Sequence, residues 1–216
     1  MGAKRKNVTP EQEANGWGDV WTWVALDADT KLCVTYHVGD RSKHSAYNFM
    51  RDAANRIVGR PQITTDAYRP YLDAIEFAFG TDVDYAHKIY GAPTPDESRY
   101  SPATCIGCEM KTVMGDPDPK HVSTSYVERQ NLTMRMSMRR FTRLTNAFSK
   151  KLENHGHAVA LYFMYYNFVR IHKTLRVTPA MEAGLTDHVW SMEELVALLP
   201  EPKAKKRGPY KKRSVA

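Results

Sequence analysis

The segment spanning residues 123–153 constrains the fold more than any other, because its pattern predicts one long amphipathic helix. Ser125 is a suitable N-cap, and Glu128 three residues later completes a capping box. Apolar residues recur along the segment at Val127, Met134, Met138, Phe141, Leu144 and Phe148. Since their spacing follows the helical period, they form one stripe that is expected to pack on a core.

The same segment is strongly cationic. It has no acidic residue between Glu128 and Glu153, whereas it contains Arg129, Arg135, Arg139, Arg140, Arg143, Lys150 and Lys151. A basic face that is simply solvated is one interpretation of this charge run. A surface that contacts phosphates, with one carboxylate at its head, is the other.

A second basic segment lies near the C-terminus. The formal net charge of the chain is +7, and residues 203–213 contain seven basic residues and no acidic one, so the rest of the chain is neutral overall. We predict that residues 200–216 form a disordered tail, in which Lys205, Lys206, Arg207, Lys211, Lys212 and Arg213 are candidate contacts to an anionic polymer. Such a tail gains affinity through counterion release, although a purely solubilising tail is the alternative. With the basic helix, it favours nucleic acid as the partner.

Several classes of protein lack their sequence signatures here. No run of eighteen apolar residues is present, so no membrane span is expected. Residues 1–18 are polar and predict a flexible lead-in rather than a secretory signal. The three cysteines fit a reducing cytosol better than a disulfide framework. Cys105 and Cys108 form a single C-x-x-C pair, and a zinc site would have to recruit other ligands, such as His87 or His121.

The order of the predicted elements indicates a mixed α/β sheet with helices on its faces. Strands are predicted at residues 20–26, 31–38, 61–65 and 82–87, the first two as a hairpin; helices are predicted at 42–58, 68–79, 123–153 and 157–169, with short helices beginning at Pro179 and at Ser191. Residues 90–122 contain five prolines and predict a long irregular loop, and residues 19–199 as a whole predict one folded core.

Two carboxylates lie at the ends of predicted elements, where functional side chains are often found. Asp66 ends an apolar strand, and Glu128 begins a helix after the long loop. Two carboxylates brought together by folding suit a pair of Mg²⁺ ions, because hard cations prefer oxygen ligands and leave positions for phosphate oxygens. The structural alternatives are that Asp66 caps a helix and that Glu128 is only the acid of a capping box.

At these positions the chain resembles the DDE-type transposases of bacterial insertion sequences. The similarity covers roughly residues 18–199 and is carried by residues 63–66, by residues 123–131, and by Tyr166, Asn167, Arg170, His172, Leu175, Thr178 and Pro179, which match the pattern Y-N-x-x-R-x-H-x-x-L-x-x-T-P. The resemblance implies a ribonuclease-H-like fold, as in retroviral integrases. It also implies Mg²⁺- or Mn²⁺-dependent cleavage at transposon ends and strand transfer into target DNA, with Asp66 and Glu128 as the second and third catalytic carboxylates.

The resemblance also sets expectations for partners and location. It implies that the protein binds double-stranded DNA at transposon ends and target sites, as a homo-oligomer, within the bacterial cytoplasm at the nucleoid. Arg129, Arg135 and Arg139 would hold DNA phosphates, together with the basic tail.

One departure from the family pattern concerns the first catalytic aspartate, which the family carries on a strand ahead of the predicted hairpin. Residues 1–17 contain neither an apolar strand nor an aspartate. We therefore expect the first core strand to be missing, with Asp27 as a weak substitute for the missing first aspartate. This departure leaves three hypotheses: an active transposase core, a non-catalytic DNA-binding remnant, and an unrelated α/β protein that binds RNA.

Overall fold

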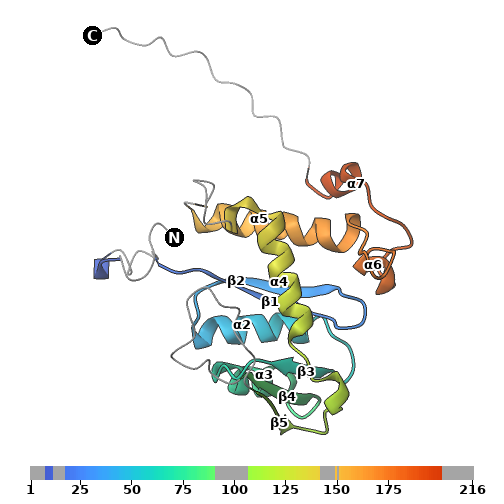
Figure 1. Ribbon diagram of the computed structural model, residues 1–216. Coiled ribbons are helices and arrows are strands. Elements are labelled where there is room, and N and C mark those ends of the chain that lie inside the picture. The colour runs from blue at the N-terminus through green and yellow to red at the C-terminus, as the bar shows by residue number, and fades with distance from the viewer. Residues whose placement is uncertain (1–7, 12–17, 91–106, 142–148, 150, 201–216) are drawn as a thin grey trace, which may run out of the picture.

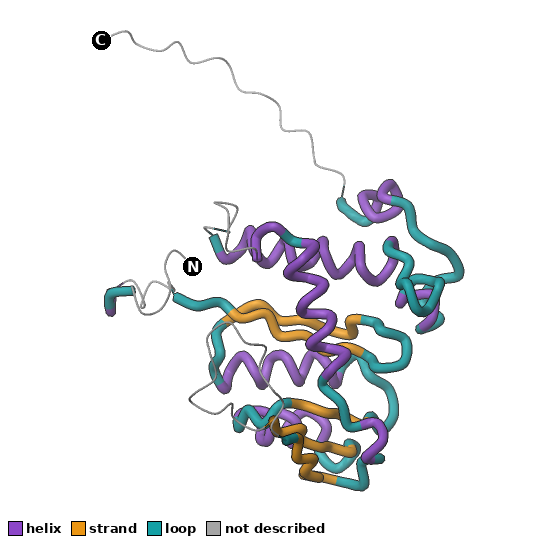
Figure 2. The backbone as a smooth tube through the Cα atoms, viewed as in Figure 1, coloured by secondary structure: helices purple, strands orange, loops and turns teal. Residues whose placement is uncertain are grey.

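The computed structural model describes residues 8–11, 18–90, 107–141, 149 and 151–200 (Figure 1). Its main elements are β1 (Trp21–Leu26), β2 (Cys33–Gly39), α2 (Lys43–Ala54), β3 (Gln62–Thr65), α3 (Pro70–Phe79), β4 (Asp84–Tyr90), β5 (Cys108–Met114), α4 (Ser125–Ser137), α5 (Leu152–Met164), α6 (Pro179–Glu182) and α7 (Met192–Ala197). The predicted mixed α/β class, with helices flanking a small mixed sheet, is confirmed (Figure 2). Most of the predicted lead-in and of the predicted basic tail lies outside the described residues.

The predicted hairpin forms as an antiparallel pair of β1 and β2. Its turn is held by the Asp27 side chain, whose two carboxylate oxygens accept bonds from the backbone nitrogens of Asp29 and Thr30. Lys31 completes the turn with a φ of 61°, and its backbone nitrogen donates to the Asp27 carbonyl. A local turn rich in aspartate therefore closes the predicted hairpin.

The second sheet contains one strand more than the sequence predicted. β3 pairs in parallel with β4, and β4 pairs antiparallel with β5. β5 falls inside the segment predicted to be an irregular loop, so that prediction is wrong for residues 108–114. Most β5 side chains are exposed, and its charged Glu109 and Lys111 hide the usual apolar alternation. Its backbone pairing with β4, rather than burial, makes it a strand.

The two sheets do not join. Within the described residues, β1 is paired only with β2, and β3 only with β4. In the view of Figure 1, the hairpin lies above the three-stranded sheet, and α2 is seen between them. Each of β1 and β3 therefore has one edge that takes no part in a ladder with the other described strands.

The hairpin is covered on both faces. On one face, Trp23 packs with Phe49 and Met50 of α2 in a core that also contains Ile75 and Tyr85. On the other face, Val24, Leu26, Tyr36 and Val38 border a second core, built from Cys33, Met134, Val159, Tyr162, Phe163 and Tyr166. Alternate residues of β1 thus face opposite layers, which is the two-residue period of a strand buried on both sides.

The single helix predicted over residues 123–153 is not observed. α4 ends at Ser137, and Met138 at its C-cap has an extended backbone. A 3-10 turn at Arg139–Phe141 follows, and α5 begins only at Leu152. A continuous helix over these residues would extend roughly 45 Å in one direction. By turning back, the chain lets Met138 and Phe141 border the same core as α5, while Leu144 and Phe148 lie outside the described residues.

The C-terminal part follows the prediction more closely. The predicted apolar helix is α5, which continues into a π-helical turn at Tyr165–Val169. There Asn167 accepts a bond from the Cys33 backbone nitrogen and donates one to the Cys33 carbonyl, both at 3.0 Å. The Tyr166 hydroxyl donates to the Lys31 carbonyl. Two residues of the Y-N-x-x-R-x-H pattern therefore fasten the end of α5 to the hairpin.

Helix ends agree in part with the sequence. Ser42, the first residue of the predicted helix, caps α2, but the helix ends at Ala54 rather than near residue 58. The capping box of Ser191 and Glu194 is present at the start of α7. No helix in the described part of the chain combines the length and the apolar character that a membrane span requires.

Candidate functional site

Asp66 follows β3 directly, and its side chain is exposed. Its Oδ1 atom accepts a bond from the Tyr68 backbone nitrogen at 3.3 Å, while its carbonyl accepts one from the Thr65 hydroxyl at 2.8 Å. The N-cap of α3 is Arg69 rather than Asp66. The carboxylate of Asp66 is therefore placed by the end of the strand and keeps most of its hydrogen-bonding capacity for other groups.

Glu128 lies in the first turn of α4, one residue deeper in the helix than the sequence predicted. The N-cap is Thr124 instead of Ser125, so the predicted capping box is absent. Instead, the Thr124 hydroxyl donates to Glu128 Oε1 at 2.7 Å. This contact orients the Glu128 side chain, which remains exposed beside the N-terminus of the helix.

Folding brings Asp66 and Glu128 to one cavity of about 750 Å³ between the two sheets. The cavity is lined by β1, by residues 61–66 and by the first two turns of α4. Asp27 also lines it, but its carboxylate accepts three bonds from its own turn, including one of 2.5 Å from the Thr30 hydroxyl. Asp27 therefore closes the hairpin turn, and its oxygens are largely used there.

The donor set of this cavity fits a hard divalent cation in type but is not complete. Asp66 and Glu128 offer the carboxylate oxygens that Mg²⁺ prefers. Within the described residues, however, no three histidine, cysteine, aspartate or glutamate side chains gather closely enough to hold a metal ion. Asp29 in the hairpin turn also lines the cavity, but it forms no such group with Asp66 and Glu128, so no step of a mechanism can be derived through a metal from these residues.

The alternative zinc site gains no support in the described residues. Cys108 is exposed on β5, and Cys105 lies outside them. His87 is buried on β4 and directs its Nε2 atom to the Tyr85 hydroxyl, 2.6 Å away. His121 sits in a 3-10 turn with its nearest acidic partner at Asp118, 3.7 Å away.

A buried hydrogen-bonded chain supports the end of β3, and the sequence did not single it out. The Tyr85 hydroxyl lies 2.8 Å from Thr65 Oγ1 and 2.6 Å from His87 Nε2. Because the Thr65 hydroxyl gives its one proton to the Asp66 carbonyl, Tyr85 must donate to Thr65, and His87 must donate to Tyr85. The spacing of Tyr85 and His87 within a predicted strand places both on one face, which was the available signal.

Burial shifts the pKa values of Tyr85 and His87, the two titratable groups in this series of hydrogen bonds. Burial raises the pKa of the Tyr85 hydroxyl to about 12 and lowers the pKa of the His87 imidazole. Both groups therefore stay neutral at pH 7. The hydrogen bonds from His87 to Tyr85 and from Tyr85 to Thr65 require this neutral state. The hydrogen bonds that link His87, Tyr85, Thr65 and Asp66 thus hold the backbone beside the cavity in one conformation.

The basic residues predicted to contact DNA are only partly visible. Arg129, Arg135 and Arg139 are exposed on α4 and the turn after it. Arg140 is also exposed but donates to the Ser149 hydroxyl at 2.6 Å. The other predicted contacts, Arg143, Lys205, Lys206, Arg207, Lys211, Lys212 and Arg213, lie outside the described residues.

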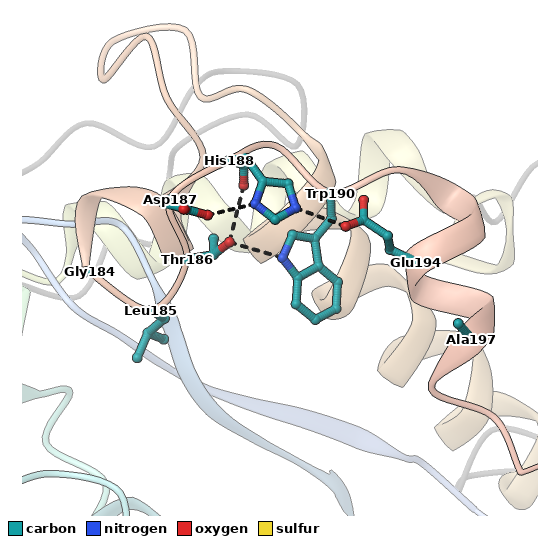
Figure 3. Close-up of a pocket in the computed structure, with 8 residues that line it drawn as sticks. All are labelled: Gly184, Leu185, Thr186, Asp187, His188, Trp190, Glu194 and Ala197. Atoms are coloured by element: carbon teal, nitrogen blue, oxygen red, sulfur yellow. Dashed lines mark hydrogen bonds and ion pairs between the residues drawn. The ribbon is translucent and has the colours of Figure 1, made fainter.

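A second hollow lies near the C-terminus and is formed by residues 184–197 (Figure 3). His188 is held between two acids, with Nδ1 2.7 Å from Asp187 and Nε2 2.8 Å from Glu194. The Trp190 indole donates to the Thr186 hydroxyl. Since every polar group shown here already has a partner within the cluster, the arrangement indicates a structural clamp on α7 rather than a reactive site.

The comparisons with known proteins leave the family open. No protein-family model matches the chain, and no curated protein or solved structure matches it significantly.

Proposed function

We propose that this chain is the DNA-processing core of an insertion-sequence transposase of the DDE type, with a ribonuclease-H-like fold. The observation that carries the proposal is that Asp66 and Glu128, far apart in the sequence, line one cavity and are both exposed. Its partner is double-stranded DNA at transposon ends and target sites, bound as a homo-oligomer at the bacterial nucleoid.

In this proposal Asp66 and Glu128 hold Mg²⁺ or Mn²⁺. When bound, the metal lowers the pKa of water and stabilises the charge that develops during phosphoryl transfer. Thr124 orients Glu128 by its hydrogen bond, and the chain from His87 to Asp66 fixes the end of β3. Arg129, Arg135 and Arg139, which lie along α4 and in the turn after it, hold DNA phosphates. The nucleophile is water or a DNA 3′-hydroxyl, so no protein side chain has to form a covalent bond.

The proposal is tested by nicking of supercoiled DNA with Mn²⁺, comparing the chain with Glu128→Gln. We expect nicking by the unchanged protein and its loss, by about a hundredfold or more, in the variant, because the amide no longer offers an anionic ligand. Glutamine can still accept the Thr124 hydrogen bond, so the helix should be unaffected.

Glu153→Gln provides the matched control, because it makes the same chemical change at another exposed glutamate in the first turn of a helix, outside the cavity. Equal nicking by Glu128→Gln and Glu153→Gln would show that Glu128 has only a structural role.

A second candidate, the non-catalytic DNA-binding remnant, is favoured by one observation: within the described residues no three carboxylate, histidine or cysteine side chains gather closely enough to hold a metal ion, and Asp27 is engaged in its turn. A remnant would show no metal-dependent nicking, while its binding to duplex DNA would still weaken steeply as salt rises.

A further inference from the structure

The guanidinium group of Arg41 rests against two aromatic rings. Its Cζ atom lies 4.8 Å from the centre of the Trp21 ring and 4.5 Å from that of the Tyr68 ring. Trp21 is the first residue of β1, and Tyr68 lies in the segment between β3 and α3. Arg41 itself belongs to the loop between β2 and α2. Three separate parts of the chain therefore meet around one exposed arginine.

The backbone that carries Arg41 is fixed as well. The Tyr68 hydroxyl donates to the Arg41 carbonyl at 2.7 Å, and the Trp23 indole donates to the Asp40 carbonyl at 3.1 Å. The Asp40 carboxylate accepts a bond of 2.6 Å from the Ser42 hydroxyl. Because the ring contacts and these bonds act together, the guanidinium is confined to one region before any ligand binds.

The donors of Arg41 are not used within the described part of the chain. A guanidinium has five N–H groups, and those of Arg41 donate to no described residue. Arg60 provides the contrast, because it donates to both carboxylate oxygens of Asp84 and to two backbone carbonyls. Arg60 therefore serves the fold, whereas Arg41 is held in place with its donors open.

Arg41 lies close to Asp66, and Tyr68 connects the two. The ring of Tyr68 contacts the Arg41 guanidinium, while its backbone nitrogen donates to the Asp66 carboxylate at 3.3 Å. Burial raises the pKa of the Tyr71 hydroxyl, Asp66 raises this pKa further and Arg41 lowers it, so both charges act on the same hydroxyl. Since Arg41 makes no ion pair with Asp66 in the described structure, its donors are free for an anion placed beside this carboxylate.

From these contacts we infer that Arg41 binds a backbone phosphate of DNA next to Asp66. The planar guanidinium bonds two phosphate oxygens at once, and the rings of Trp21 and Tyr68 limit the directions that it can take. This anchor holds the sugar–phosphate backbone beside a carboxylate that has free oxygens. The inference rests on the proposed function, since it specifies one contact to the DNA named there. Arg41 lies outside the basic helix and the basic tail, where the sequence predicts the phosphate contacts.

The test measures binding of the full chain to a short labelled DNA duplex by fluorescence anisotropy, without divalent metal. Arg41→Gln should weaken binding by at least about tenfold, because a bidentate, charge-assisted contact is lost. It should also reduce the slope of log affinity against log salt by about one, since one phosphate contact disappears. Arg41→Lys keeps the charge but not the planar group, so it should recover only part of the affinity.

Arg51→Gln is the matched control, because it removes the same charge from an exposed arginine on α2 that does not line the cavity. Arg51 donates to the exposed Asn48 side chain, and its loss should change the affinity for DNA by less than about twofold. Thermal denaturation without DNA should give similar melting temperatures for all these proteins, since ring contacts at an exposed site add little stability. Should Arg41→Gln melt far below the others, Arg41→Lys carries the comparison, with Arg51→Lys as its control.

Three results would overturn the inference. Arg41→Gln could lose no more affinity than Arg51→Gln, which would reduce the role of Arg41 to its charge and leave the proposed function standing. Inorganic phosphate could raise the melting temperature of the unchanged protein while its affinity for DNA does not depend on Arg41, which would assign the site to a small phosphorylated molecule. The unchanged protein could fail to bind duplex DNA, which would overturn this inference together with the DNA partner of the proposed function.

Discussion

At the scale of single residues, the described structure separates side chains that are free for chemistry from those that hold the backbone. Asp66 and Glu128 are exposed and each accepts one bond from a neighbour, whereas Asp27 accepts three. The residue type alone does not make this distinction, because all three are acids next to turns or helix starts. Local hydrogen bonding therefore ranks the candidates, and it places Asp27 last.

The first prediction concerns the buried chain beside Asp66. Tyr85→Phe removes the hydroxyl between Thr65 and His87, and it leaves the His87 donor without its partner in a buried position. We expect the free energy of unfolding to fall by about 2 kcal/mol, measured by urea denaturation.

Tyr68→Phe is the matched control, because its hydroxyl makes one exposed bond to the Arg41 carbonyl. Its cost should be well below that of Tyr85→Phe. Similar losses of unfolding free energy in both variants would mean that the buried hydrogen bonds of Tyr85 stabilise the fold no more than an exposed one does.

At the scale of elements, the pattern that suggested a transposase is also a fastening of the fold. Asn167, at the end of α5, bonds both backbone groups of Cys33 across a separation of 134 residues. Thr178 in the same pattern caps α6 through a bond from the Met181 backbone nitrogen. The sequence indicated that these residues belong together but not what they contact, because their partners are backbone atoms of a distant strand.

Asn167→Ala tests this fastening. The change leaves the buried nitrogen and carbonyl of Cys33 without their side-chain partner, so we expect a loss of about 3 kcal/mol in the free energy of unfolding. Asn154→Ala, at an exposed position of α5, should change the stability by a few tenths of a kcal/mol at most. Thermal and urea denaturation of both variants provide the measurement; equal stabilities would show that β2 does not need Asn167.

The attachment of α7 should depend on pH. Bonds to Asp187 and Glu194 raise the pKa of His188 above its ordinary value of 6.5. A raised pKa in the folded state stabilises the fold fully below pH 6.5, and this contribution is lost as the pH rises through the raised pKa. The pKa values of Asp187 and Glu194 are lowered, so their contribution is present above their ordinary values of 3.8 and 4.5 and is lost as the pH falls through the lowered ones.

Hydrogen exchange of residues 192–197 measures this dependence. After correction for intrinsic exchange, protection should be greatest between about pH 5 and 6 and decrease toward alkaline pH. His188→Gln should remove the alkaline decrease, because glutamine does not titrate. If the variant keeps the same profile, another group controls α7.

At the scale of the whole molecule, the described chain consists of two sheets that share helices but not hydrogen bonds. α2 and α3 cover a core reached by both sheets, whereas α4 and α5 pack on the hairpin alone. The cavity that contains Asp66 and Glu128 is the consequence of this division.

Charge at the molecular scale gives the last prediction. Residues 203–216 carry seven basic residues, and without them the chain is neutral overall. Deleting them should weaken binding to duplex DNA and reduce the slope of log affinity against log salt by up to about six, because each phosphate contact releases close to one counterion. A salt titration of both proteins measures the slope. A control protein keeps the tail at its full length but has glutamine in place of the seven basic residues, which separates the loss of charge from the loss of other contacts. An unchanged slope in the deletion variant would show that the tail does not contact DNA.

The sequence by itself determined what depends on near neighbours. Local sequence patterns predicted the hairpin, the starts of α2 and α7, and the strands β3 and β4. It also selected Asp66 and Glu128, because acids at the end of a strand and the start of a helix are recognisable locally.

Only the tertiary structure decided the features that need distant partners. β5 is a strand because β4 lies beside it, and the predicted long helix breaks because α5 has to return to the hairpin core. The cavity that unites Asp66 with Glu128 exists because β1 and β3 remain apart. Sequence periodicity reports which side of an element is apolar, whereas pairing between strands depends on backbone groups that every residue carries alike.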